Sequence, residues 1–148
     1  DSIVTAQELD AEMPERIVHH PAERQRERQV IEARIYLPDC LIKYDQKGHI
    51  FLVDCLTLWM SNLLIHQDIN IQTAQCQQLL AVLPTLKANV ILVSNETGLG
   101  VVPFGELTRK FVDESGRLHQ DIGKIADKVI FCVAGFPMTL KDEINLKK

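Results

Sequence analysis

The stretch HIFLVD at residues 49–54 decides the fold class of this chain. Its first part, His49 to Val53, is a compact apolar run rich in strand-forming residues, and its apolar character is continuous rather than alternating. Continuous runs are typical of parallel strands that are buried on both faces. Asp54 follows immediately, so a carboxylate stands at the carboxyl end of the predicted strand.

Two more runs of this kind predict buried strands, NVILV at residues 89–93 and KVIFCVA at residues 128–134, and residues 2–4 are typical of a strand's end. Helical periodicity of apolar residues fills the intervals. It covers residues 35–42, 56–64, 72–87 and 106–127, the last with a break at Gly116. The alternation predicts the α/β class, with a doubly wound, mostly parallel sheet and helices on both faces. We expect a single domain over residues 1–148, with a polar tail at residues 142–148.

Polar residues follow the predicted strands at Thr5, Asp54, residues 94–96 and Gly135. In doubly wound folds ligands bind outside the carboxyl ends of the strands, so the sequence predicts a nucleotide site at that edge. Asp54 has two interpretations from the residues alone: it binds magnesium, or it caps the helix that follows. The loop TGLGVVP at residues 97–103 either brings backbone close to a ligand or only makes turns.

The segment from Thr5 to Glu32 concentrates histidines, arginines and carboxylates. Thr5 and Glu8 have the spacing of a capping box, which predicts a helix that Pro14 then interrupts. A stripe on one side of this helix is formed by Leu9, Met13 and Ile17. At about 100° per residue His20 lies on the side of that stripe. His20 is therefore the candidate for a protein-built site, and the alternative is a histidine that compensates the helix dipole at a C-terminus.

Composition excludes several function classes. The 148 residues are 46% hydrophobic and 24% charged, as in one globular domain, and the net charge of -4 gives no support for a nucleic-acid partner. Arginines at positions 24, 26 and 28 form either a phosphate clamp or a solvated segment. The four cysteines show neither CxxC pairs nor zinc spacing, which favours a reducing cytoplasm. No apolar run reaches about 18 residues, so we predict no membrane span, and no Walker A motif is present.

Five ordered motifs make the chain resemble a known family. They are VTAQ at residues 4–7, DAEMPERIVHH at 10–20, VDCLTLWMSNLL from Val53, VSNETGLGVVP at 93–103 and GRLHQDIGKIAD at 116–127. The chain resembles the bifunctional adenosylcobinamide kinase / adenosylcobinamide-phosphate guanylyltransferase family of cobalamin assembly. The resemblance covers nearly the whole chain.

The resemblance implies a P-loop NTPase-like fold and an enzyme that phosphorylates adenosylcobinamide and then transfers GMP from GTP to the product. The implied catalytic residue is His20, which carries GMP as a phosphoramidate between the two half-reactions. The implied nucleotide-binding residues are Val4, Thr5, Ala6, Pro21, Ala22, Glu23, Arg24, Glu32 and Asp54. Asp54 is also the implied magnesium contact. GTP and ATP are the implied substrates, Mg²⁺ the cofactor and a homotrimer the assembly.

The chain departs from the family pattern in two places. The first strand and the P-loop of the family are expected before Asp1, so we expect the domain to be incomplete at its N-terminus and this fragment to be inactive. Gln25 and Arg28 stand where the family has proline and tryptophan. The alternative function is that of a P-loop-less, non-catalytic paralogue that binds a nucleotide or corrinoid or serves as an assembly subunit.

Overall fold

The computed structural model describes residues 2–4, 30–66 and 68–144. The predictions for residues 5–29, which include the capping box and the helix that carries His20, lie outside the described residues. The same holds for the last part of the predicted polar tail, at residues 145–148.

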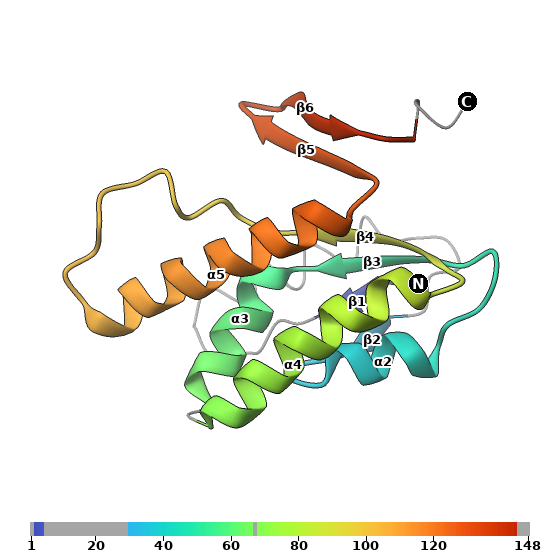
Figure 1. Cartoon of the computed structure of the whole chain (residues 1–148), viewed down its shortest axis with the longest axis horizontal. Helices are drawn as coiled ribbons and strands as arrows, with labels where there is room; N and C mark the ends of the chain where they lie inside the picture. Colours follow the sequence, from blue (N-terminus) through green and yellow to red (C-terminus); the bar gives the residue numbers. More distant parts are fainter. Residues whose placement is uncertain (1, 5–29, 67, 145–148) are drawn as a thin grey trace.

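A four-stranded parallel sheet forms the centre of the described structure (Figure 1). Its strands are β1 (Ser2–Val4), β2 (Val30–Glu32), β3 (Ile50–Asp54) and β4 (Asn89–Val93), in the order β2-β1-β3-β4. All three pairings are parallel. The α/β class and the strands predicted at residues 2–4, 49–53 and 89–93 are confirmed. Strand β2 was not predicted, because its sequence VIE lies within a polar segment and forms no continuous apolar run.

The helices follow the predicted segments closely. They are α2 (Leu37–Lys43), α3 (Leu56–Ile65), α4 (Ile69–Val82), the short 3-10 turn η1 (Leu83–Thr85) and α5 (Glu106–Ile125). Helix α4 begins at Ile69 because the Asp68 carboxylate accepts the backbone N–H groups of Asn70 and Ile71. The predicted break at Gly116 is wrong, since α5 runs through it. A glycine inside a helix costs only about 1 kcal/mol, and burial of Leu118 in the next turn offsets that cost.

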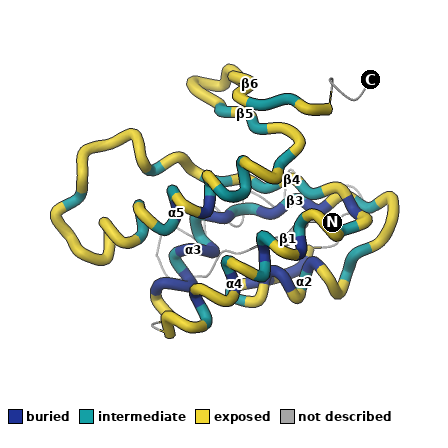
Figure 2. Tube along the Cα trace, viewed as in Figure 1, coloured by how far each residue is buried: buried dark blue, intermediate teal, exposed yellow. Residues whose placement is uncertain are grey.

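The core lies between the helices and one face of the sheet (Figure 2). Ile31, Phe51 and Val53 supply the sheet side, and apolar residues of α2, α3, α4 and α5 supply the other side. Trp59 is fully buried there, and its Nε1 donates a hydrogen bond of 2.8 Å to the carbonyl oxygen of Ile35. The indole therefore fixes the segment that joins β2 to α2 while it fills the core.

The opposite face of the sheet is open within the described residues. Val30, Ile50 and Ile91 are each about half exposed, at 50%, 53% and 52%. Alternation along the strands places these residues opposite Ile31, Phe51 and Leu92. Helices therefore cover one face among the described residues, and the predicted doubly wound arrangement is not confirmed.

The last two strands form a separate antiparallel hairpin. β5 (Lys128–Val133) pairs with β6 (Phe136–Asp142), and the two make their own sheet. The prediction that residues 128–134 form a buried strand of the parallel sheet is wrong, because Ile130 and Val133 are 48% and 50% exposed. The physical reason is the turn: Ala134 and Gly135 both have positive φ, the conformation of a tight hairpin. Gly135 therefore does not lie at the carboxyl edge of the parallel sheet.

Candidate nucleotide site

The carboxyl ends of the four parallel strands meet in one row. Val4 is in register with both Glu32 and Asp54, and Asp54 is in register with Val93. Glu32 and Asp54 share one face of the sheet, because their neighbours Ile31 and Val53 both point into the core. The fold thus brings two of the predicted nucleotide-binding carboxylates to the same edge and the same side.

Asp54 is the last residue of β3. Helix α3 takes Cys55 as its N-cap residue, and the Cys55 side chain makes no capping hydrogen bond. Asp54 thus stands one residue before the N-cap position, and the choice between its magnesium and cap interpretations stays a prediction. The Glu32 side chain is 70% exposed, and its Oε2 lies 3.7 Å from a guanidinium nitrogen of Arg34. An exposed ion pair of this kind is weak and leaves the carboxylate accessible to a ligand.

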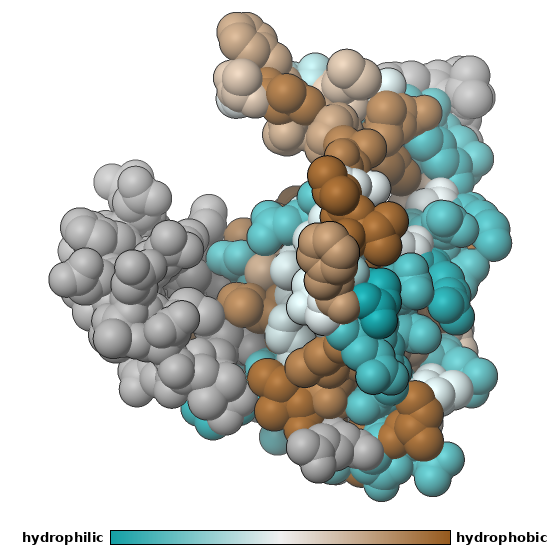
Figure 3. Space-filling model, turned by 90° about the vertical axis from the view of Figure 1, so that its left-hand side faces the viewer, coloured by the Kyte–Doolittle hydropathy of each residue, from teal (hydrophilic) through white to brown (hydrophobic). Residues whose placement is uncertain are grey.

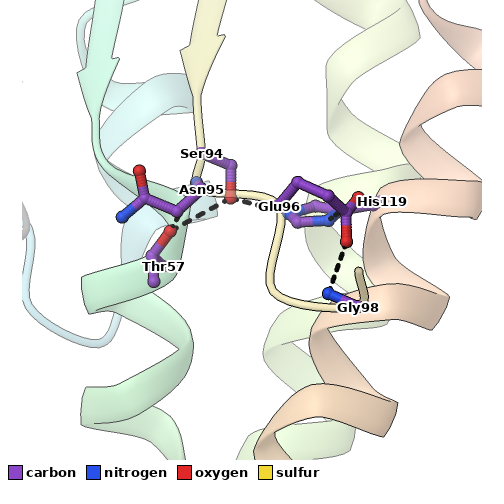
Figure 4. A network of polar contacts seen from close by, with 6 residues as sticks. All are labelled: Thr57, Ser94, Asn95, Glu96, Gly98 and His119. Carbon is purple, nitrogen blue, oxygen red and sulfur yellow. Dashed lines mark hydrogen bonds and ion pairs between the residues drawn. The ribbon is translucent and has the colours of Figure 1, made fainter. Parts of the chain in front are cut away.

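A polar bridge extends the edge beyond β4 and is formed by Thr57, Ser94, Asn95, Glu96, Gly98 and His119 (Figure 4). Ser94 is its centre: Ser94 Oγ lies 3.3 Å from Thr57 Oγ1 and 2.6 Å from His119 Nε2. The backbone N–H of Asn95 donates to Thr57 Oγ1 at 2.8 Å. The polar bridge joins the end of β4 to the first turn of α3 and the middle of α5.

Glu96 completes the polar bridge on its outer side. Its Oε1 accepts the backbone N–H of Gly98 at 2.6 Å, and its Oε2 lies 4.0 Å from His119 Nδ1. Both ring nitrogens of His119 therefore face polar partners. The histidine side chain is 22% exposed, so these contacts are only partly screened by solvent. Chemically, hydroxyl, imidazole and carboxylate groups here form a chain that is able to hold a proton or a polar ligand group.

Sequence reasoning found only part of this arrangement. It selected residues 94–96 because they follow a strand, but it missed Thr57 and His119. Thr57 lies three residues after Asp54, within the first turn of α3, which was the available signal. His119 is remote in sequence and reaches Ser94 only because α5 packs against α3. The remaining predicted site residues lie outside the described residues: Thr5, Ala6, His20, Pro21, Ala22, Glu23 and Arg24.

Within residues 30–66 and 68–144, no group of three or more His, Cys, Asp or Glu side chains has the arrangement of a metal site. In the same part of the chain, no helix combines the length and the apolar character needed to cross a membrane.

A parallel sheet that gathers carboxylates and hydroxyls at its carboxyl edge is the architecture of a nucleotide-binding α/β protein. The chain belongs to the cobinamide kinase / cobinamide phosphate guanyltransferase family, which matches residues 2–140. The family predicted from the five motifs is thereby confirmed.

Curated relatives agree with this membership. The bifunctional adenosylcobalamin biosynthesis protein CobP of Pseudomonas aeruginosa is 48% identical over 141 residues, which are 95% of this chain and 82% of that protein. The bifunctional adenosylcobalamin biosynthesis proteins CobU of Escherichia coli and Salmonella typhimurium are 32% and 33% identical, and each match covers 94% of this chain and 84% of the relative.

Proposed function

We propose that this chain phosphorylates the hydroxyl group of adenosylcobinamide and then transfers GMP from GTP to the resulting phosphate. The description of the family names both activities, and the relatives are named bifunctional adenosylcobalamin biosynthesis proteins. The observation that carries the proposal for this chain is the register of Val4, Glu32 and Asp54. It lines up residues from two family motifs, together with the glutamate that the resemblance implies as a nucleotide contact, at the edge where α/β folds bind nucleotides.

The proposed nucleophile is His20. A neutral imidazole nitrogen attacks the α-phosphorus of GTP, an N–P bond forms, and the P–O bond to pyrophosphate breaks. The phosphate of the acceptor then displaces the imidazole and takes over the GMP group. Nucleotide contacts are proposed for Val4, Thr5, Ala6, Pro21, Ala22, Glu23, Arg24, Glu32 and Asp54.

The proposal includes Mg²⁺, and the residues fit this ion. Mg²⁺ in phosphoryl-transfer sites is held by one or two carboxylates together with the phosphates of the substrate. Asp54 supplies one carboxylate at the carboxyl end of β3. Asp54 would hold the ion, which would supply charge neutralisation on the phosphates of the substrate.

A doubly wound fold also belongs to the proposal. The chain passes from β2 through α2 to β3, and from β3 through α3 and α4 to β4, in one direction across the sheet. Residues 5–29 lead from β1 to β2 in the opposite direction. Connections between parallel strands are almost always right-handed, and such a reversal of direction at β1 is the strand order of a doubly wound sheet.

The open face of the sheet carries the half-exposed Val30, Ile50 and Ile91. A second helical layer on this face, as a doubly wound fold requires, would bury these side chains. Ile91→Asp tests this expectation by urea unfolding. A clear loss of stability supports a covered face, and an unchanged stability contradicts it.

Two strands with a free pairing side support the proposal of a larger, P-loop NTPase-like sheet. Among the described strands, β4 pairs only with β3 and β5 pairs only with β6. Each therefore offers an edge at which a further strand of the family fold could pair. The homotrimer and the cytoplasmic location remain proposals too, and light scattering of the purified protein and cell fractionation test them.

A GMP adduct tests the transfer mechanism. The full-length protein is incubated with GTP and Mg²⁺, and peptide mass spectrometry locates the added GMP group. We expect the adduct on His20. It should be absent from His20→Ala and retained in His19→Ala, the matched control from the adjacent position. An adduct that survives His20→Ala would contradict the assignment.

A further inference from the structure

The loop between β4 and α5 exposes apolar side chains to an unusual degree. Leu99 is 77% exposed, Val101 93%, Val102 73% and Phe104 100%. We call residues 97–104 the apolar loop. It leaves the carboxyl end of β4 and arches beyond the helices before it reaches the start of α5 (Figure 1). An exposed cluster of this size is typical of an interaction site rather than of ordinary surface.

Hydrogen bonds hold the apolar loop at both ends. At its beginning, the polar bridge fixes Ser94 and Asn95, and Glu96 accepts the N–H of Gly98. At its end, Nη1 of Arg109 donates to the carbonyl oxygens of Pro103, at 3.2 Å, and Phe104. Polar contacts to the backbone thus shape the loop, while its apolar side chains point outward. Such an arrangement presents a binding surface without the ordering cost that a free loop would incur.

The position of the apolar loop identifies its ligand. The loop begins three residues after Ser94, whose neighbour Val93 is the register partner of Asp54. The hydroxyl group of the acceptor must reach a nucleotide phosphate at this edge of the sheet. The rest of the acceptor must therefore lie beyond the edge. A corrinoid is a macrocycle with broad apolar faces, far larger than the group that reacts. Its binding requires apolar surface that adjoins the polar edge, as in most ligand sites.

We propose that Leu99, Val101, Val102 and Phe104 bind the corrin ring of the acceptor, while the polar bridge marks the side toward the reacting edge. This inference rests on the proposed function. Figure 3 looks onto the end of the molecule that carries the loop and shows apolar and hydrophilic surface side by side. The exposed apolar residues of the β5–β6 hairpin are a weaker candidate, because the hairpin forms a separate sheet and neither of its strands pairs with β4 (Figure 1).

The test is the double variant Val101→Ser, Val102→Ser, with Phe104→Ser as an independent second variant. Both change exposed side chains, so folding should be unaffected. The matched control is Ile69→Ser, which changes a 54% exposed aliphatic residue at the start of α4. Binding of adenosylcobinamide is measured by equilibrium dialysis, and steady-state kinetics give the KM for acceptor and for nucleotide.

We expect each loop variant to weaken acceptor binding about tenfold, the ratio that loss of one buried apolar contact produces. The KM for nucleotide should stay within about twofold of wild type, and Ile69→Ser should bind like wild type. Unchanged acceptor binding would overturn the inference. So would an equal rise in both KM values, or a change in oligomeric mass alone, which would identify the loop as an interface between copies. The inference and the proposed function can fail separately. If the protein shows no transfer activity but its acceptor binding still depends on the loop, the inference is supported and the proposed function is not.

Discussion

The hydroxyl oxygen of Ser94 lies 2.6 Å from Nε2 of His119, and this contact joins the end of β4 to the middle of α5. Between these two residues the chain forms the apolar loop and the first half of α5. The contact therefore closes the base of the segment that we assign to acceptor binding. Two observations of different kinds, a tight polar contact and an exposed apolar surface, come together at one edge of the sheet.

Ser94→Ala should lower the free energy of unfolding by about 1 kcal/mol, because Thr57 and His119 each lose a partly buried partner. The matched control is Ser61→Ala. The Ser61 hydroxyl donates only to the carbonyl oxygen of Thr57 within the same helix, so its loss should cost less. Urea unfolding followed by Trp59 fluorescence measures both, and equal losses would contradict a special role for Ser94.

Asp54→Asn should lower the rate of GMP transfer by on the order of 100-fold, because a neutral amide binds Mg²⁺ poorly. Part of the loss should be recovered at higher Mg²⁺ concentration. Asp39→Asn serves as the control, since Asp39 is an α2 carboxylate that accepts from Gln78 Nε2 at 2.9 Å, away from the strand ends. A rate for Asp54→Asn that matches Asp39→Asn at every Mg²⁺ concentration would remove Asp54 from the metal site.

The Asp45 carboxylate should make stability depend on pH. Hydrogen bonds from the backbone N–H groups of Lys87 and Ala88 lower the pKa of Asp45, with the Lys87 bond the larger cause. A carboxyl group with a lowered folded-state pKa stabilises the fold above its ordinary pKa of about 4. That contribution is lost as the pH falls through the folded-state value.

Asp45→Asn should therefore be less stable than wild type at pH 7, and the difference should shrink below about pH 4. Urea midpoints across this range measure it, with Asp113→Asn of α5 as the control. A difference that stays constant with pH would show that the charge of Asp45 is not involved.

The thiols of Cys76 and Cys132 should differ in their rates of alkylation. Burial, with a smaller contribution from Glu114, raises the pKa of Cys76 to about 11, so almost none of it is thiolate at pH 7. Cys132 is exposed on β5. Iodoacetamide should therefore modify Cys132 on the order of 100-fold faster than Cys76 in the native protein. In urea the rates should converge, and fast native modification of Cys76 would show that α4 opens readily.

The sequence predicted those elements whose patterns are local. Residues 49–53 and 89–93 are continuous apolar runs, and both became parallel strands. Residues 128–134 have the same pattern but pair with β6, because hydrophobicity records a tendency to be buried and not the identity of a partner strand. Strand β6 itself was missed, since Pro137 and charged residues near its end hide its pattern.

The candidate site likewise contains residues that local patterns predict and contacts that only the packing of helices creates. Asp54 was found from its position after a strand, and residues 94–96 were found by the same rule. Their connection to Thr57 and His119 depends on how α3 and α5 pack, which no local pattern encodes. The proposed roles of Glu32 and of the residues around His20 are implied by the family resemblance, and they remain predictions.

The strand order has a consequence for how this chain reaches its native state. In the parallel sheet Ser2 pairs with Val30 and Ile50 pairs with Asn89, so every pairing must wait for a long intervening segment to fold back. In the hairpin, Val133 pairs with Phe136, and such a contact forms within about 1–10 μs. Topologies rich in distant pairings assemble orders of magnitude more slowly. We therefore expect contacts within the hairpin to form first and closure of the parallel sheet to limit the rate at which its carboxyl edge forms.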